Sequence, residues 1–142
     1  MREILFRGKR VDNGEWIEGS LIHQTKFYGD PVDCYHILYD GEFHADYYGS
    51  VEVIPETIGE FTGMLDKNGK KIFEGDIVIL FEYVKKTFDV DDGEVRYGRG
   101  GFHVKEFSTL NSLNALASYD GVFRGEIIGN IHDNPELLEV KK

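Results

Sequence analysis

Residues 35–53 show the clearest alternation of hydrophobic and polar positions in the chain. The even positions are mostly polar or charged, and the odd positions are mostly apolar or aromatic: Tyr35, Ile37, Tyr39, Phe43, Ala45, Tyr47, Val51 and Val53. A period of two predicts extended chain with one buried face. Asp40-Gly41 also signals a turn. A three-residue loop would pair Tyr39 with Phe43 and keep the apolar face whole, so we expect an odd-length loop or a glycine bulge there.

Two asparagine–glycine pairs mark tight turns. Residues 4–11 and 16–22 read as strands on either side of Asn13-Gly14, and this dipeptide tolerates the positive φ of hairpin turns. Within residues 61–80, Asp66-Lys67-Asn68-Gly69 turns the chain back in a related way. We therefore predict a hairpin at each place, with Gly14 and Gly69 as structural turn residues.

The second half of the chain carries further strand patterns. Residues 94–97 and 102–107 read as strands on either side of a glycine-rich turn, and residues 125–131 form a last strand. The polar stretch 82–93 is expected to be an exposed hairpin or loop.

Helical signals are few. One helix is predicted near residues 108–120, because Ser108 or Thr109 can cap it, leucines recur at helical spacing and Gly121 can end it. We expect Leu113 in its apolar stripe to be buried. A short helical turn should begin at Asn134-Pro135, where the missing N–H of proline costs nothing.

Composition supports a mainly β, β-rich α+β class. The chain has 142 residues, with three alanines against 47 valine, isoleucine, threonine and aromatic residues. Alanine favours helices, whereas branched and aromatic side chains suit a pleated sheet. The length fits one domain or two small intertwined lobes. A single cysteine, Cys34, excludes an internal disulfide, and we expect it to be a buried structural thiol. No apolar run is long enough for a transmembrane helix, so we expect a cytoplasmic protein.

The net charge of −10 is unevenly distributed. Residues 27–66 contain no lysine or arginine but nine acids and five of the eight tyrosines. One interpretation is a solvated acidic face that keeps the protein soluble. The other is a docking surface for a basic partner. Its predicted members combine acids with tyrosines that lie off the apolar face: Asp40, Glu42, Asp46, Tyr28 and Tyr48.

Two other groups of residues carry possible chemistry. His36 and His44 share strand parity with nearby carboxylates, so they could converge on a metal ion, but no metal-motif spacing appears and the wet face of a strand is the favoured interpretation. The segment from Arg96 to Phe102 combines glycines, two cations and two aromatics, as nucleic-acid contacts do. It departs from the RNA-binding RNP1 pattern, and the charge of −10 disfavours nucleic acid. No cofactor is indicated.

Three stretches together resemble the YopX-like proteins of phages and prophages of Gram-positive bacteria. They are ILFRGK at residues 4–9 with NGEW at 13–16, TGMLDKNGKKIFEGDIV at 62–78, and IGNIHDNPELL at 128–138. Their order over nearly the whole chain makes the match specific. The resemblance implies a β-rich fold with an SH3-like barrel, a phage or prophage origin and self-association. It would divide the chain into an N-terminal β lobe (about 1–60) and a barrel lobe (about 61–142).

The Gly75-Asp76 pair belongs to the second of these stretches. In SH3-like barrels such a pair precedes a strand after a diverging turn, and Asp76 would bond local backbone N–H groups. These residues, like Pro135, therefore have expected structural roles. The resemblance implies no activity.

The leading hypothesis is a non-catalytic phage accessory protein that acts through contacts with a host or phage protein, or through homo-oligomers. The first alternative is a nucleic-acid-binding barrel that uses the Arg96–Phe102 segment. The second alternative is a metal-dependent hydrolase centred on His36 and His44. The most informative experiment is a pull-down from infected host lysate.

Overall fold

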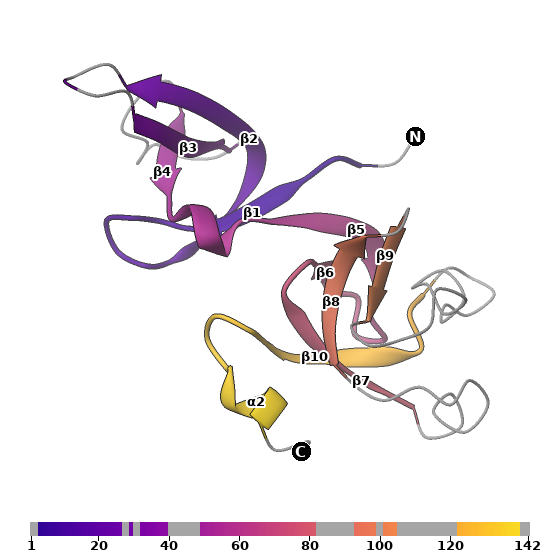
Figure 1. The fold of residues 1–142 in the computed structure, drawn as a ribbon. Helices are drawn as coiled ribbons and strands as arrows, with labels where there is room; N and C mark the ends of the chain where they lie inside the picture. Colours follow the sequence, from indigo (N-terminus) through magenta and orange to yellow (C-terminus); the bar gives the residue numbers. More distant parts are fainter. Residues whose placement is uncertain are drawn as a thin grey trace. The chain divides into compact units, whose positions relative to one another are not determined.

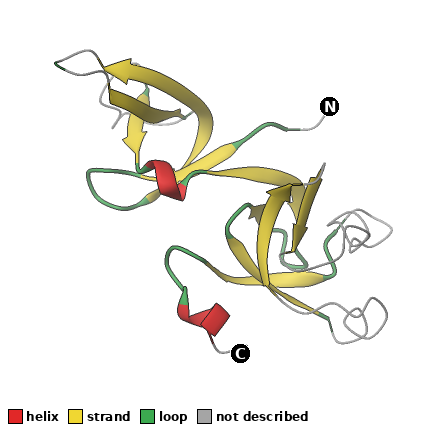
Figure 2. Ribbon diagram, in the orientation of Figure 1, coloured by secondary structure: helices red, strands yellow, loops and turns green. Residues whose placement is uncertain are grey.

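The fold comes from a computed structural model, which describes residues 3–26, 29, 32–39, 49–81, 93–98, 101–104 and 122–139 (Figure 1). The predicted helix at 108–120 with Leu113 and the polar stretch from 82 to 92 lie outside these residues. Strands dominate the described chain (Figure 2), which confirms the mainly β class. No helix in these ranges is long and apolar enough to cross a membrane.

The described elements are ten strands, one 3-10 turn and one short α-helix. The strands are β1 (Phe6–Lys9), β2 (Trp16–Lys26), β3 (Val32–Leu38), β4 (Ser50–Val53), β5 (Gly59–Leu65), β6 (Lys71–Phe73), β7 (Asp76–Leu80), β8 (Gly93–Gly98), β9 (Gly101–Val104) and β10 (Gly125–Asn130). The 3-10 turn η1 spans Pro55–Thr57, and the helix α2 spans Glu136–Glu139. The latter is the short C-terminal helical turn that Asn134-Pro135 predicts.

The strands form two antiparallel sheets. Their orders are β4-β3-β2-β1-β5-β6 and β10-β7-β8-β9. Among the described strands neither sheet closes into a barrel, so the expected SH3-like barrel is not seen there. The chain divides into two compact units, Met1–Phe61 and Thr62–Lys142. That these units are lobes of one domain stays a prediction.

In the first unit, the sheet curls until β4 meets the chain just after β1. Arg10 and Val53 form an isolated bridge, and the amide of Ile54 donates to the carbonyl of Lys9 at 2.8 Å. The interior of the curl is narrow. A Cβ at Gly8 would lie 3.0 Å from Cβ of Val53, so a larger residue there would require Val53 to shift by a few tenths of an ångström.

The predicted alternation around residue 37 accounts for this interior. Ile37, Val51 and Val53 are odd-numbered and buried. They lie on one face because Ile37 pairs with Val51 across β3 and β4. Cys34 is 4% exposed on the opposite face of β3, which confirms the expected buried thiol. The predicted loop at Asp40–Glu42 lies outside the described residues.

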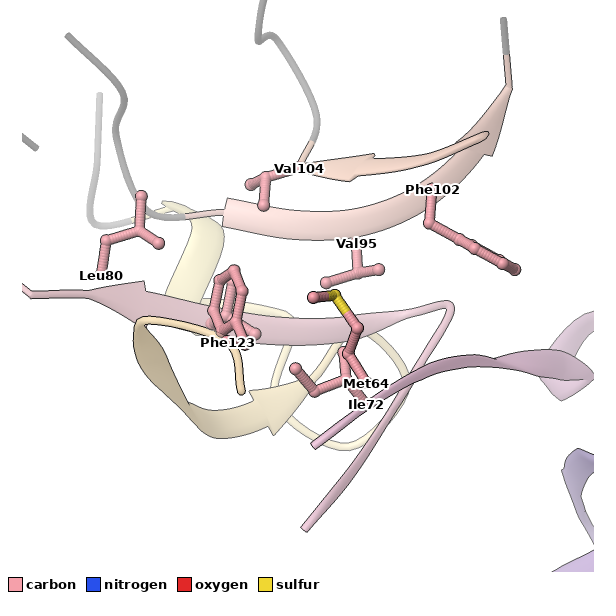
Figure 3. Packing of buried hydrophobic residues seen from close by; sticks show 8 residues of the cluster. Met64, Ile72, Leu80, Val95, Phe102, Val104 and Phe123 are labelled. Carbon is pink, nitrogen blue, oxygen red and sulfur yellow. The ribbon is translucent and has the colours of Figure 1, made fainter. Parts of the chain in front are cut away.

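The second unit has a hydrophobic core drawn from five strands and from Phe123, two residues before β10. Figure 3 shows its side chains pointing toward one another between the strands. The cluster comprises Met64, Ile72, Val78, Leu80, Val95, Phe102, Val104 and Phe123. Every member is less than one-tenth exposed, so this cluster holds the strands of the unit together by burial of apolar surface.

Asp66 connects the β5–β6 hairpin to β10. Its carboxylate is 1% exposed. Oδ1 accepts hydrogen bonds from the backbone amides of Asn68 and Lys70, each at 2.9 Å. Oδ2 accepts from the amide of Ile127, 61 positions away in sequence, at 3.0 Å. The turn itself uses Gly69 at φ 81°, as the Asn-Gly pair predicts. Asp66 therefore sets both the turn and the position of β10.

A second tight turn joins β6 to β7. Gly75 adopts φ 89°, a region that side-chain-bearing residues rarely enter. Its amide donates to the carbonyl of Val95 at 2.9 Å, and its carbonyl accepts from Ile131 at 2.8 Å. Asp76 is buried, and its Oδ2 accepts from the amide of Phe73 at 2.8 Å. The turn thereby contacts both β8 and the segment after β10.

The Gly75 turn yields one stability prediction. Gly75→Val should lower the free energy of unfolding by about 1–3 kcal/mol, because a β-branched residue is strained at this φ. Gly101→Val is the matched control: a Cβ at Gly101 meets nothing within 4 Å, and the residue lies in a strand. Urea denaturation of both variants measures the difference. Equal losses would show that Gly75 does not need its positive φ.

The hydrogen bonds of Asp66 yield a second stability prediction. Asp66→Asn leaves one oxygen for three backbone N–H donors, so at least one buried donor loses its acceptor. We expect a loss of about 1–3 kcal/mol in unfolding free energy. Asp12→Asn, at an exposed carboxylate, should cause a smaller loss. Thermal and urea unfolding of the two variants provide the comparison, and an unaffected Asp66→Asn protein would contradict the role assigned to Asp66.

Candidate functional site

A group of polar and aromatic side chains lies on one face of the β2–β3 hairpin. In the antiparallel register His23 pairs with Tyr35, and Thr25 pairs with Asp33. Positions two apart on a strand share a face, so all four side chains lie on the same side. We call His23, Thr25, Asp33 and Tyr35 the His23 patch. Threonine and tyrosine favour strands, which is consistent with this hairpin geometry.

The position of β4 explains why the patch is exposed. β4 pairs only with residues 35–38 of β3, so Asp33 and its partner Thr25 lie beyond the end of β4. Figure 1 shows β2 and β3 side by side with β4 next to β3. The same face of β3 is therefore buried at Ile37 and open at Asp33, with Tyr35 half-buried between them.

The four side chains contact one another directly. The rings of His23 and Tyr35 stack, with centroids 4.9 Å apart and planes 21° apart. Nε2 of His23 lies 3.2 Å from Oδ1 of Asp33. The hydroxyl of Thr25 donates to the same oxygen at 3.2 Å. The side chains of His23 and Asp33 are 52% and 62% exposed. The patch thus presents an ordered carboxylate beside two stacked rings.

This arrangement suits binding better than catalysis. The histidine and threonine both orient Oδ1 of Asp33, and within the described residues nothing bonds its Oδ2. A carboxylate with one open oxygen can accept hydrogen bonds from a cationic group. The threonine hydroxyl points to the carboxylate rather than to the histidine, so the described geometry lacks a nucleophile activated by a base.

The predicted docking surface lies outside the described residues. This holds for all of its members: Asp40, Glu42, Asp46, Tyr28 and Tyr48. Tyr28 belongs to the segment that joins β2 to β3, and so lies in sequence between Thr25 and Asp33 of the His23 patch. Of the acids in residues 27–66, Asp33 is exposed, whereas Asp66 is buried in its turn. Asp66 therefore does not contribute to an acidic surface.

His36 lies next to Cys34 on the other face of β3. Its neighbours across the sheet are Ile22 on β2 and Glu52 on β4. Both ring nitrogens of His36 are buried and have no hydrogen-bond partner among the described residues. Across the described ranges, no three histidine, cysteine or acidic side chains are arranged to hold a metal ion. His44, the other histidine of the metal hypothesis, lies outside them.

The structure places the residues of the proposed nucleic-acid segment in different environments. Phe102 is buried in the second core. The guanidinium of Arg96 bonds to the carboxylate of Glu94, with Nε and Oε2 3.0 Å apart. Tyr97 is 59% exposed, and its ring meets Phe102 edge-on. Arg99 is outside the described residues. Only Tyr97, among the described members of this segment, is both exposed and aromatic.

One cluster escaped the sequence analysis. On β1, Arg7 and Lys9 lie on one face and both approach the indole of Trp16 on β2. The distances to the ring centroid are 4.7 Å from the guanidinium carbon and 5.5 Å from Nζ. The signal was present in the Asn13-Gly14 turn, because its hairpin register pairs Lys9 with Trp16. The cluster explains physically why these residues occur together in the first family-like stretch.

An ion pair stabilises the same turn. The guanidinium of Arg10 binds both carboxylate oxygens of Asp12, at 2.9 and 2.7 Å. This hydrogen bonding lowers the pKa of Asp12 and raises the pKa of Arg10. Both side chains are at the surface, so water screens the interaction and its effect on stability is small.

Comparisons with known proteins support the three family-like stretches. No curated protein matches the chain. A crystal structure of protein EF1440 from Enterococcus faecalis is 25% identical, with 97% of this chain and 99% of that chain covered and a TM-score of 0.51. The family model described as "YopX protein" matches residues 5–139. Because this match spans nearly the whole sequence, the chain belongs to the YopX family.

Proposed function

We propose that this protein is a non-catalytic accessory protein of a phage or prophage, which binds a host or phage protein in the host cytoplasm. Self-assembly is a second mode of contact within the same proposal. Membership of the YopX family supports the assignment to this group of proteins. The similar protein from Enterococcus faecalis has no activity in its description, so the binding role is argued from the residues of this chain.

The observation that carries the proposal is the exposed carboxylate of Asp33 beside the stacked rings of His23 and Tyr35. Aromatic side chains give rigid contact area, and both rings belong to strands rather than to loops. Asp33 and Tyr35 of the patch belong to residues 27–66, a stretch of the chain that has nine acids and no lysine or arginine. Such a field attracts a basic partner and raises its rate of encounter.

The acidic segment can be tested by charge neutralisation. The triple variant Asp40→Asn, Glu42→Gln, Asp46→Asn should slow association with the partner and weaken its salt dependence, because charges at the rim of an interface act mainly on encounter. The partner is first captured from infected host lysate and identified by mass spectrometry. Association rates are then measured with the purified partner at two salt concentrations.

A matched control separates local from overall charge. The triple variant Asp89→Asn, Asp91→Asn, Asp92→Asn changes the net charge equally outside residues 27–66. Its association should stay close to that of the unmodified protein. If the two triple variants behave alike, the acidic segment serves solubility and the docking proposal is wrong.

A metal-dependent function at His36 is the second candidate, and one observation favours it. Burying a polar atom without a hydrogen bond is costly, and His36 has two such nitrogens. A metal ion bound through one nitrogen would remove part of that cost. The further ligands would come from residues outside the described ranges, such as His44, since the described ones hold no suitable trio.

His36→Leu distinguishes the two candidates. Without a metal, leucine removes two unpartnered polar atoms and should raise the unfolding free energy by about 1 kcal/mol. With a resident metal, the same change should lower stability and reduce the metal content found by elemental analysis. Treating the unmodified protein with a chelator provides the control, because its melting temperature should then fall only if a metal is bound.

A further inference from the structure

We propose that the His23 patch recognises an arginine side chain on the basic partner. This inference rests on the proposed protein-binding function and names the chemistry of its contact. Arginine carries a planar guanidinium that forms two parallel hydrogen bonds to a carboxylate and stacks on flat rings. The patch offers both features on one face of one hairpin.

The carboxylate is held ready for such a contact. Thr25 and His23 both approach Oδ1 of Asp33, at 3.2 Å each, which restricts rotation of the carboxylate. Oδ2 has no bond among the described residues, and the side chain is 62% exposed. A guanidinium N–H group can therefore reach Oδ2 from solvent, and the restricted carboxylate loses little entropy when it binds.

The rings supply the second half of the site. One face of the His23 imidazole lies against Tyr35, at a centroid distance of 4.9 Å. The His23 side chain remains 52% exposed, which leaves ring surface available to a stacked group next to Asp33. Tyr35 is half-buried and paired on both sides, with His23 on β2 and Val53 on β4, so the rings form a supported platform.

The charge of the Asp33 carboxylate favours a cationic side chain as the bound group. The patch holds one carboxylate, and its only basic member is His23, which is charged only when protonated. A lysine ammonium would satisfy the carboxylate but would not stack as a plane on the ring. A metal ion would require further strong ligands, and none accompany His23 and Asp33 in the described chain. Arginine is the protein cation that uses both the open oxygen and the ring.

Two peptides provide the probe. One has eleven residues, with three arginines separated by glycine and serine; the other has lysine at the same three positions. Affinities are measured by calorimetry at low salt with the full chain. We expect the arginine peptide to bind about fivefold to tenfold more tightly than the lysine peptide. Asp33→Asn should weaken arginine binding about tenfold, because the charge-assisted pair becomes a neutral one.

Control variants isolate each part of the patch. Glu56→Gln removes an exposed acid of the same segment outside the patch and should leave the arginine preference unchanged. His23→Ala should reduce the preference, and His23→Phe should restore part of it, since phenylalanine keeps the flat ring but not the contact of Nε2 with Asp33. Melting temperatures verify that each variant is folded. If Asp33→Asn does not fold, the arginine preferences of His23→Ala and His23→Phe test the arginine site instead.

The outcomes also separate this inference from the proposed function. Equal affinity for the two peptides, or equal effects of Asp33→Asn and Glu56→Gln, would mean general charge attraction and would overturn the arginine site. Partner binding that still depends on Asp40, Glu42 and Asp46 would then leave the docking proposal standing. A normal arginine preference with no effect of the acidic triple variant would overturn the docking surface and leave the arginine site.

Discussion

A buried carboxylate that accepts three backbone N–H groups organises the second unit. Asp66 has two of its donors inside its own turn and the third, Ile127, in the last strand. A charge with 1% exposure is tolerable because both oxygens are hydrogen-bonded. The neighbouring backbone continues the link, since Lys67 donates to the carbonyl of Gly125 and Phe123 donates to Leu65. The core residue Phe123 is held in place by this connection.

The first unit uses its β2–β3 hairpin for two purposes. Where β4 covers it, the hairpin contributes Ile37 to a narrow interior in which Gly8 lies close to Val53. Beyond β4, the same face turns outward and carries the His23 patch. A rigid interior next to an open surface keeps contact residues on strands, where their geometry is defined better than on loops. This division supports a binding role for the outer half.

The sequence predicts those features that depend on residues close together in the chain. The Asn-Gly turns and the alternation around Ile37 follow from neighbours in the chain, and the burial of Cys34 follows from its residue type. Asp66 was misjudged as one of the acids of a charged segment, because its burial depends on Ile127, which is distant in sequence. The His23 patch was missed for a similar reason. The segment between β2 and β3 contains the turn residues Gly29-Asp30-Pro31, but these do not select one register, so the pairing of His23 with Tyr35 does not follow from the sequence.

The distance in sequence between Asp66 and Ile127 also has a consequence for synthesis of the chain on the ribosome. The β5–β6 turn can form as soon as Lys70 has been made, but its third donor is added 57 residues after Lys70. Until then, the nascent second unit lacks β10 and the link to Phe123, so its apolar side chains remain without their last covering strand. The first unit lacks such a dependence among its described contacts, because all its pairings close within residues 1–61. Folding during translation should therefore complete the first unit early and leave the second unit exposed to chaperones until β10 emerges.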